Sequence, residues 1–294
     1  MDFSTTMSRA GINPADVDID RIGAWQQLRT DDKPGRKNGR VMVFSNRPLR
    51  LYYQNHSAGI AGHYSDGPSF LSRQDFAQVR RAKADAAVCR ELNQVEIAKM
   101  AGTNWQIAKP ADPQHAYLVR KQVRPHGIRQ LGDNLVVPML DAAGKLWSYQ
   151  TITGAGEKKY LYGGRKRGCF YQLGDVPRSV IVLAEGFATA ATLHDALNIP
   201  VACCFDAINL EPVAVAVRQQ YPNVRIVIGA DNDRFTEGNP GLTYATKAAG
   251  AVHGLVTYPE FGLPGIKDKL TDWNDLAVCY NATIIAQLFA EVLA

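Results

Sequence analysis

Carboxylate side chains follow two short apolar segments of the chain, and they are its clearest candidates for chemistry. Glu185 comes directly after 179–184, and Asp231 and Asp233 follow 224–229. Both segments are rich in β-branched residues and too short for a helix, so each is predicted to be a strand. Ligands of parallel α/β sheets bind beyond the carboxyl ends of the strands, so these acids should share one crevice. Clustered carboxylates favour hard divalent cations such as Mg²⁺.

The spacing of the acids indicates how many can reach one ion. Asp231 and Asp233 are two residues apart, and alternate side chains of an extended segment point the same way, so we expect both to face the ion. Asp272 and Asp275 begin a predicted late helix, where Asp272 either caps the helix or joins the metal site. Divalent cations held by few carboxylates bind phosphate oxygens, so the pattern predicts metal-dependent chemistry on nucleic-acid phosphates.

An alternation of strands and helices must position these acids. From residue 179 onward, strand-like and helical segments follow one another, with prolines at the boundaries. This repetition predicts an α/β domain at 179–294 with a mostly parallel, Rossmann-like sheet and right-handed crossovers. The expected strands are 179–184, 200–205, 224–229 and 254–258, and the expected helices are 187–197, 210–220, 241–251 and further helices toward the C-terminus.

A basic α+β lobe is predicted at 112–178, before the acidic sheet. Residues 134–140 and 146–152 are predicted strands, joined by a glycine-containing turn at 141–145. The segment 158–168 then carries five cations interleaved with tyrosines and glycines. Such a segment fits a groove for single-stranded nucleic acid, with cations for phosphates and rings for bases. The alternative is a charged surface loop.

The N-terminal part is predicted to be a small basic β-rich module at 1–70, followed by a connecting helix at 71–111. A basic loop at 32–40 either binds phosphates or is a polar hairpin tip that serves solubility. The basic side of the helix is either solvated or in contact with nucleic acid. The expected elements are strands at 41–44 and 49–53 and a helix from Ser72 to about Lys99.

The composition is that of a soluble globular protein of 294 residues, long enough for two or more lobes. No stretch approaches the roughly 18–20 apolar residues of a membrane helix. The five cysteines lack metal-ribbon or disulfide spacing, so we expect a reduced, cytoplasmic setting and no zinc. Cys203 and Cys204 are expected in the core, and His56 and His63 are not expected to bind metal.

Charge is distributed unevenly along the chain. Residues 1–179 carry 27 Lys and Arg against 16 Asp and Glu, whereas residues 180–294 carry 6 against 12. A basic part beside an acidic part indicates that a polyanion binds next to a metal site, unless the charges are simply solvated. The candidates for binding nucleic acid or nucleotide are Lys33, Arg36, Lys37, Arg40, Arg120, Lys121, Lys158, Lys159, Tyr160, Arg165, Lys166 and Arg167.

The acidic part resembles the Toprim domain of bacterial-type primases, type IA and type II topoisomerases and some nucleases. The preceding lobe is similar to the basic subdomain of primases, and the closest likeness is to Toprim primases of plasmids, phages and integrated elements. The resemblance covers roughly 170 residues, from about 112 to 280. The segments that carry it are 134–141, 144–145, 158–161, 182–191, 228–233 and 272–277.

The resemblance implies a role for each matching residue. Glu185 would be the metal-bound or base-like glutamate, and Asp231 and Asp233 would hold catalytic Mg²⁺ or Mn²⁺. Asp272 would occupy a third acidic position, with Asn274 and Asp275 in place of a more acidic pattern. The implied metal ligands are Glu185, Asp231, Asp233, Asp272 and Asp275, and the residues implied to face phosphates are Lys159 and Tyr160.

Three features depart from the replicative primases that the chain resembles. Thr189 stands where they carry an aspartate four residues after the glutamate, and Tyr162 stands where they carry an asparagine. Their N-terminal zinc ribbon has no matching cysteines here. The first two changes would weaken a second metal site. The missing ribbon would leave template selection to another part of the chain, such as the module at 1–70.

The sequence therefore predicts a primase-like nucleotidyltransferase. A 3′-hydroxyl would attack the α-phosphate of a nucleoside triphosphate on a single-stranded DNA template, and pyrophosphate would leave. A separate replicative helicase is an expected partner, and a membrane is not. Two alternatives stay open: a Toprim nuclease that uses the same carboxylates, and a single-strand-binding accessory protein without activity. A type IA topoisomerase is disfavoured because the chain is too short for strand gating.

Overall fold

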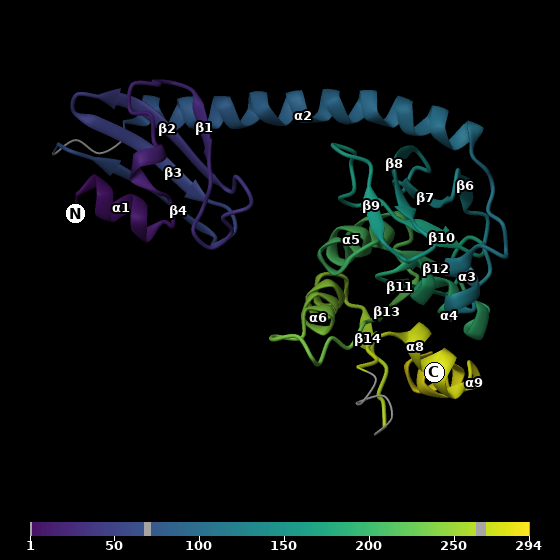
Figure 1. Cartoon of the computed structure of the whole chain (residues 1–294). Coiled ribbons are helices and arrows are strands. Elements are labelled where there is room, and N and C mark those ends of the chain that lie inside the picture. The colour runs from purple at the N-terminus through teal and green to yellow at the C-terminus, as the bar shows by residue number, and fades with distance from the viewer. Residues whose placement is uncertain (1, 68–71, 263–268, 294) are drawn as a thin grey trace. The chain divides into compact units, whose positions relative to one another are not determined.

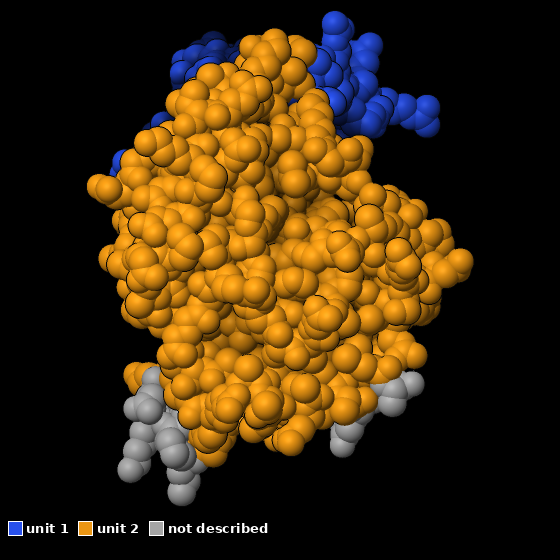
Figure 2. All heavy atoms as spheres, turned by 90° about the vertical axis from the view of Figure 1, so that its right-hand side faces the viewer, with its two compact units in different colours: residues 1–91 blue, residues 92–294 orange. Residues whose placement is uncertain are grey.

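The computed structural model describes residues 2–67, 72–262 and 269–293. The chain divides into two compact units, residues 1–91 and residues 92–294, which Figure 2 colours separately. The division falls between Glu91 and Leu92, inside the predicted connecting helix. In the described part of the chain, no helix is long and apolar enough to cross a lipid bilayer.

The first unit is built on an antiparallel sheet with the order β1–β2–β3–β4 (Figure 1). The two predicted strands are confirmed, and both are longer than the sequence pattern indicated. Strands β1 and β4 were not predicted, because their Gln, Gly and His residues interrupt the alternation of apolar and polar residues that marks a strand. The elements are α1 (Phe3–Arg9), η1 (Pro14–Asp16), β1 (Trp25–Leu28), β2 (Gly39–Asn46), β3 (Leu49–Asn55) and β4 (Ile60–Ser65).

Helix α2 (Arg73–Ile107) begins directly after Ser72, where the helix was predicted to start, and a capping box holds its first turn. The Ser72 hydroxyl accepts a hydrogen bond from the Asp75 N–H (3.1 Å), and the Asp75 carboxylate accepts one from the Ser72 N–H (2.7 Å). The helix continues beyond Lys99, where the sequence prediction ended it. Ala101 packs with Val136 and Tyr149 in a buried cluster, so tertiary contacts sustain the last turns.

The second unit begins with an antiparallel sheet in which strands β5 to β9 follow one another in order. The strands β7 and β8 have the predicted bounds. They pair with each other so that Leu135 faces Ile152 and Val137 faces Gln150. The elements are β5 (Lys109–Pro110), α3 (Ala116–Lys121), β6 (Arg129–Leu131), β7 (Asn134–Leu140), β8 (Leu146–Ile152) and β9 (Lys158–Tyr160).

A second sheet of the same unit has the strand order β10–β12–β11–β13–β14. Its strands are parallel except for β10, which is antiparallel to β12. The predicted alternation of strands and helices is confirmed throughout. The elements are β10 (Tyr171–Leu173), β11 (Val180–Ala184), α4 (Phe187–Leu197), β12 (Val201–Cys203), η2 (Ala207–Asn209), α5 (Leu210–Gln220), β13 (Arg225–Gly229), α6 (Pro240–Val252), β14 (Leu255–Thr257), α8 (Trp273–Tyr280) and α9 (Thr283–Leu293).

Strand β11 shows how this sheet is buried on both faces. Val182 and Ala184 belong to the cluster that contains α4, α8 and α9, whereas Ile181 and Leu183 belong to the cluster that contains α5 and α6. The first cluster also includes residues of β7 and β8, so the two sheets of this unit share one core. Cys203, the last residue of β12, and Cys204 directly after it are buried with free thiols, as expected. This shared core fixes the carboxyl ends of β11, β12 and β13.

Candidate catalytic site

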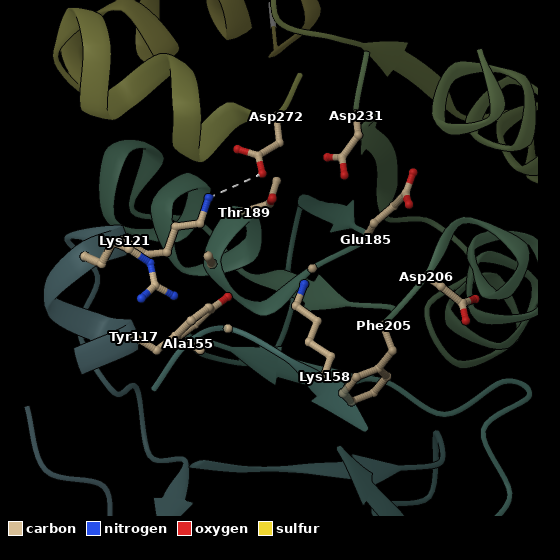
Figure 3. A pocket seen from close by; sticks show the side chains of 14 residues that line it. Tyr117, Lys121, Ala155, Lys158, Glu185, Thr189, Phe205, Asp206, Asp231 and Asp272 are labelled. Carbon is tan, nitrogen blue, oxygen red and sulfur yellow. Dashed lines mark ion pairs between the residues drawn. The ribbon is translucent and has the colours of Figure 1, made fainter. Parts of the chain in front are cut away.

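A pocket of about 360 Å³ opens at the carboxyl ends of β11 and β12 and beside β13 (Figure 3). Carboxylates reach it from the parallel sheet and from the start of α8, and cations reach it from α3 and β9. The charged residues that line it are Arg120, Lys121, Lys158, Glu185, Asp206, Asp231 and Asp272. The structure therefore brings Glu185 and Asp231 together, as the strand-end argument predicted.

Glu185 follows β11 directly, and its Oε1 is buried without a hydrogen-bond partner within the described ranges. Burial, together with the nearby charges of Asp233 and Asp206, raises the pKa of Glu185 to about 7. A carboxylate oxygen that is both buried and unpartnered is costly, because nothing replaces the water it has lost. A cation would supply the missing partner.

Asp231 lies two residues beyond β13 and points into the same pocket (Figure 3). Its Oδ1 is also buried, with no hydrogen-bond partner among the described residues. Burial raises the pKa of Asp231 well above its usual range, and the charges of Glu185, Asp272 and Asp233 raise it further. The pocket thus holds a second buried oxygen that lacks a partner.

Asp233 does not follow the prediction that it would face the same ion as Asp231. The Arg234 N–H donates to the Asn232 carbonyl (2.7 Å), so the chain turns at Asp233 and the alternation of an extended segment is lost. The Asp233 Oδ2 instead accepts a hydrogen bond from the Gly241 N–H (3.0 Å) at the start of α6. Asp233 acts on the pocket through its charge. This charge raises the pKa of Glu185 and is the second-largest cause of the shift, after burial.

Asp272 both caps α8 and lines the pocket, so the two interpretations left open for it are compatible. Its Oδ1 accepts a hydrogen bond from the Asp275 N–H (2.7 Å), and the Asp275 carboxylate accepts one from the Asp272 N–H (3.5 Å). The Lys121 Nζ forms an ion pair with Asp272 (3.9 Å), which Figure 3 shows, and a second ion pair with Asp275 (3.3 Å). Asp275 therefore belongs to the cap and the ion pair, outside the pocket lining.

Lys158, and not Lys159, is the lysine of β9 that faces the carboxylates (Figure 3). Burial raises the pKa values of Glu185, Asp231 and Asp272, and the Lys158 ammonium partly offsets all three shifts. Successive residues of a strand point to opposite faces. Lys159 accordingly points away and forms an exposed ion pair with Glu157 (3.2 Å).

The donors in the pocket fit a hard divalent cation. Two buried carboxylate oxygens have no hydrogen-bond partner among the residues that the structure describes, and oxygen ligands are those that Mg²⁺ and Mn²⁺ prefer. Within the described ranges, no three His, Cys, Asp or Glu side chains are close enough together to hold a metal ion as they stand. Binding a cation would therefore draw Glu185, Asp231 and Asp272 together.

Comparison with known proteins places the sheet in a family. Residues 180–280 match the family model described as Toprim domain. These residues form a Toprim domain. The matched range begins at β11 and ends with α8, so it contains Glu185, Asp231, Asp233, Asp272 and Asp275.

Similar proteins extend over more of the chain than the Toprim domain. Two Escherichia coli proteins named DNA primase TraC are 32% identical to it, one over 260 residues (83% of this chain and 24% of the relative) and one over 206 residues (65% and 14%). The chain thus spans less than a quarter of the length of these relatives. Among solved structures, the primase fragment of the Bacteriophage T7 primase-helicase protein is 14% identical with a TM-score of 0.46, covering 60% of this chain and 74% of that one.

The loop after β12 of the Toprim domain contributes a carboxylate that sequence reasoning missed. Asp206 lines the pocket, caps η2 by accepting a hydrogen bond from the Asn209 N–H (3.0 Å), and pairs with Lys166. Phe205 before it has a φ of 75°, a strained value for a bulky residue. Asp206 follows a parallel strand just as Glu185 does, so the strand-end rule, applied to every strand, would have found it.

The basic segment 158–168, which begins with β9, is held against this loop of the Toprim domain. The Tyr160 hydroxyl donates to the Phe205 carbonyl (3.1 Å), and the buried Asn209 side chain bonds the Gly168 N–H and the Cys169 carbonyl (both 2.9 Å). Tyr160 therefore contacts the Toprim backbone through its hydroxyl, where the resemblance implied a phosphate contact. Lys166 forms an ion pair with Asp206, so its charge is not available to a nucleic-acid phosphate unless that pair opens.

The remaining predicted cations belong to both units of the chain. Arg120 lines the pocket and donates to the Gly154 carbonyl (2.7 Å), while Arg165 stacks on Trp147. In the first unit, Lys33, Arg36 and Lys37 are exposed before β2, and Arg40 is half-buried within it. The roles of all these residues in binding nucleic acid stay predictions.

Gly241 offers a test of how tightly the Toprim site is packed. A methyl group at Gly241 would lie 2.5 Å from the Asp231 carbonyl oxygen, whereas one at Gly250 of the same helix meets nothing within 4 Å. We expect Gly241→Ala to lower the free energy of unfolding by about 1–3 kcal/mol. Gly250→Ala should raise it by about 0.4–1 kcal/mol. Thermal unfolding measures both, and equal effects would contradict the close packing at Asp231.

The raised pKa of Glu185 predicts how cation binding depends on pH. A carboxyl must lose its proton to bind a metal, and Glu185 keeps its proton up to a pH of about 7 in the metal-free protein. Apparent affinity for Mg²⁺ or Mn²⁺ should therefore rise with pH up to about 7, and Glu185→Gln should reduce the slope. The metal-free protein should lose stability over the same rise, because its folded state binds the proton more tightly than its unfolded state. Isothermal titration at several pH values checks this, and a flat profile would contradict it.

Proposed function

We propose that this chain carries a DNA-directed primase activity, a nucleotidyltransferase reaction that makes short primers on single-stranded DNA. The observation that carries the proposal is a pair of buried oxygens, Glu185 Oε1 and Asp231 Oδ1, which have no hydrogen-bond partner in the described part of the chain. They lie in a pocket that Lys158 and Arg120 also line. Similarity to the DNA primases TraC over 83% of the chain supports it.

Each pocket residue has a role in this proposal. Glu185, Asp231 and Asp272 would hold Mg²⁺ or Mn²⁺, and a bound cation would orient phosphates and offset the charge that develops on them. Lys158 and Arg120 would bind the triphosphate as fixed cations. Lys121 would position Asp272, which it contacts from α3 (3.9 Å). A 3′-hydroxyl would attack the α-phosphate, the bond to the β-phosphate oxygen would break, and pyrophosphate would leave.

The parts outside the Toprim domain would handle the template. In this proposal the lobe at 112–178 is a basic primase-type subdomain that holds single-stranded DNA, and the module at 1–70 selects the template site. A helicase on a separate chain is a proposed partner. The free thiols of all five cysteines agree with a reduced, cytoplasmic setting for the reaction.

A primer-synthesis assay tests the proposal. Full-length protein is incubated with single-stranded DNA, labelled nucleoside triphosphates and Mg²⁺, and wild type is compared with Asp231→Ala and with Asp175→Ala, an exposed acid outside the pocket. We expect product from wild type and Asp175→Ala, and a loss of about 100-fold or more in Asp231→Ala, the size of effect typical for removing one charge-stabilising group.

Three results would contradict the proposal, and two of them name another function. Equal product from wild type and Asp231→Ala would remove the role of the carboxylate. Mg²⁺-dependent degradation of the DNA without added nucleotides would indicate a Toprim nuclease. DNA binding without product, and without any response of thermal stability to Mg²⁺ or Mn²⁺, would indicate an accessory protein that has lost activity.

A further inference from the structure

Two tyrosines of the basic segment, only two residues apart, have different surroundings. The Tyr160 hydroxyl bonds the Phe205 carbonyl, and the Lys166 Nζ lies 4.9 Å from the centre of its ring. Tyr162 is 95% exposed and makes no hydrogen bond or ring contact with any described residue. Tyr160 thus stabilises the fold through its contacts, whereas Tyr162 presents a large planar ring to solvent.

The turn that displays Tyr162 is held in place on both sides. Before it, the Leu161 N–H donates to the Tyr149 carbonyl (3.2 Å) and the Leu161 side chain packs on a buried cluster. After it, Gly163 has a φ of 74°, and a methyl group at Gly164 would lie 2.3 Å from the Ser148 Oγ. The ring is therefore kept outward by packed neighbours and is not the tip of a loose loop.

The segment that carries Tyr162 is rich in cations, and the turn before the neighbouring strand β8 adds one more. Arg167 is exposed, and Lys159 is exposed with a single acidic partner, Glu157. Arg165 and Lys145 both lie over the Trp147 ring, 4.6 Å and 3.8 Å from its centre. An exposed ring among cations is the combination that binds single-stranded nucleic acid, because every base has a face to stack and every nucleotide a phosphate to pair.

We propose that Tyr162 is a base-stacking residue for single-stranded nucleic acid, with Arg167 contacting a neighbouring phosphate. The strand must be single because a duplex has no free base face to offer at this position. Lys158 of the pocket is four residues away, so at most roughly 14 Å of chain separates Tyr162 from a residue that lines the pocket. The inference rests on the proposed function, and it adds the residue on which a template base stacks.

Binding of defined oligonucleotides tests the stacking directly. The full chain is titrated in EDTA, without nucleotides, against a labelled oligothymidylate and against an oligomer of the same length made of abasic residues. Tyr162→Ala should weaken oligothymidylate binding by about 5- to 150-fold and leave binding of the abasic oligomer unchanged. Tyr162→Phe should recover most of the lost affinity, because the ring is kept.

Two control variants separate stacking from charge and from general surface effects. Arg167→Ala should weaken binding of both oligomers and reduce the slope of log affinity against log salt by about 1. Tyr280→Ala removes another exposed tyrosine, on α8, and should change neither affinity. Tyr162→Ala should melt at the wild-type temperature, since its ring contacts nothing in the described structure.

The outcomes distinguish this inference from the proposed catalysis. Equal oligothymidylate affinity for Tyr162→Ala and wild type, an equal loss on both oligomers, or no binding by wild type would each overturn it. Primer synthesis that survives Asp231→Ala would overturn the catalytic proposal and leave stacking intact, because the binding assay contains neither metal nor nucleotide.

Discussion

Asp231→Asn is expected to raise the melting temperature of the metal-free protein and to abolish its stabilisation by Mg²⁺. The Asp231 carboxylate is buried near Glu185 and Asp272, and its Oδ1 has no partner in the described structure. An amide of the same shape removes the buried charge and the repulsion between like charges. Wild type at a Mg²⁺ concentration of 100 Kd should gain about 2.7 kcal/mol, or about 5–10 °C, and the variant should gain none.

Scanning calorimetry in EDTA and in Mg²⁺ measures both effects of Asp231→Asn. Asp175→Asn is the matched control, because Asp175 is exposed outside the pocket and its variant should keep the wild-type response. If Asp231→Asn melted lower than wild type in EDTA and kept its full response to Mg²⁺, Asp231 would be a structural residue and the metal assignment would be wrong.

The strand-end argument explains why much of the site could be predicted from sequence. The segments 179–184 and 224–229 are apolar on both faces, as strands covered by helices must be, and the acids that follow them stand out. Glu185 and Asp231 therefore occupy the predicted crevice. Asp206 was missed because the apolar strand before it, with Cys203 and Cys204, was interpreted only as part of the core. Asp206 nevertheless follows a buried parallel strand, as Glu185 does.

The rest of the site depends on contacts that no local pattern contains. Asp233 leaves the crevice because a turn at Asn232–Arg234 redirects the chain. Asn232 favours a turn, but its presence does not determine which way the Asp233 side chain points. Arg120 and Lys121 reach the pocket only because α3 packs beside the Toprim domain, a contact between segments far apart in sequence. In the first unit, β1 and β4 pair with predicted strands although their own residues lack alternation.

Trp273→Ala is expected to lower the free energy of unfolding by about 3–5 kcal/mol, the range for deleting a buried tryptophan. Trp273 is fully buried, and its ring lies 4.9 Å from that of Phe289, centre to centre. A methyl group at Gly229 would lie 3.4 Å from the Trp273 Nε1, so the ring also packs on the strand end that leads to Asp231. The cavity should loosen Asp272 as well, and weaken the thermal response to Mg²⁺.

Trp273→Phe separates lost packing from lost hydrogen bonding. The Trp273 Nε1 is buried without a partner in the described structure, so phenylalanine removes no bond and keeps a ring against Phe289. Its cost should stay below about 1.5 kcal/mol, as for a swap that keeps most of the volume. Urea unfolding measures both variants. Equal losses for the alanine and phenylalanine variants would mean that packing at this ring is not what holds α8 and its capping aspartate at the pocket.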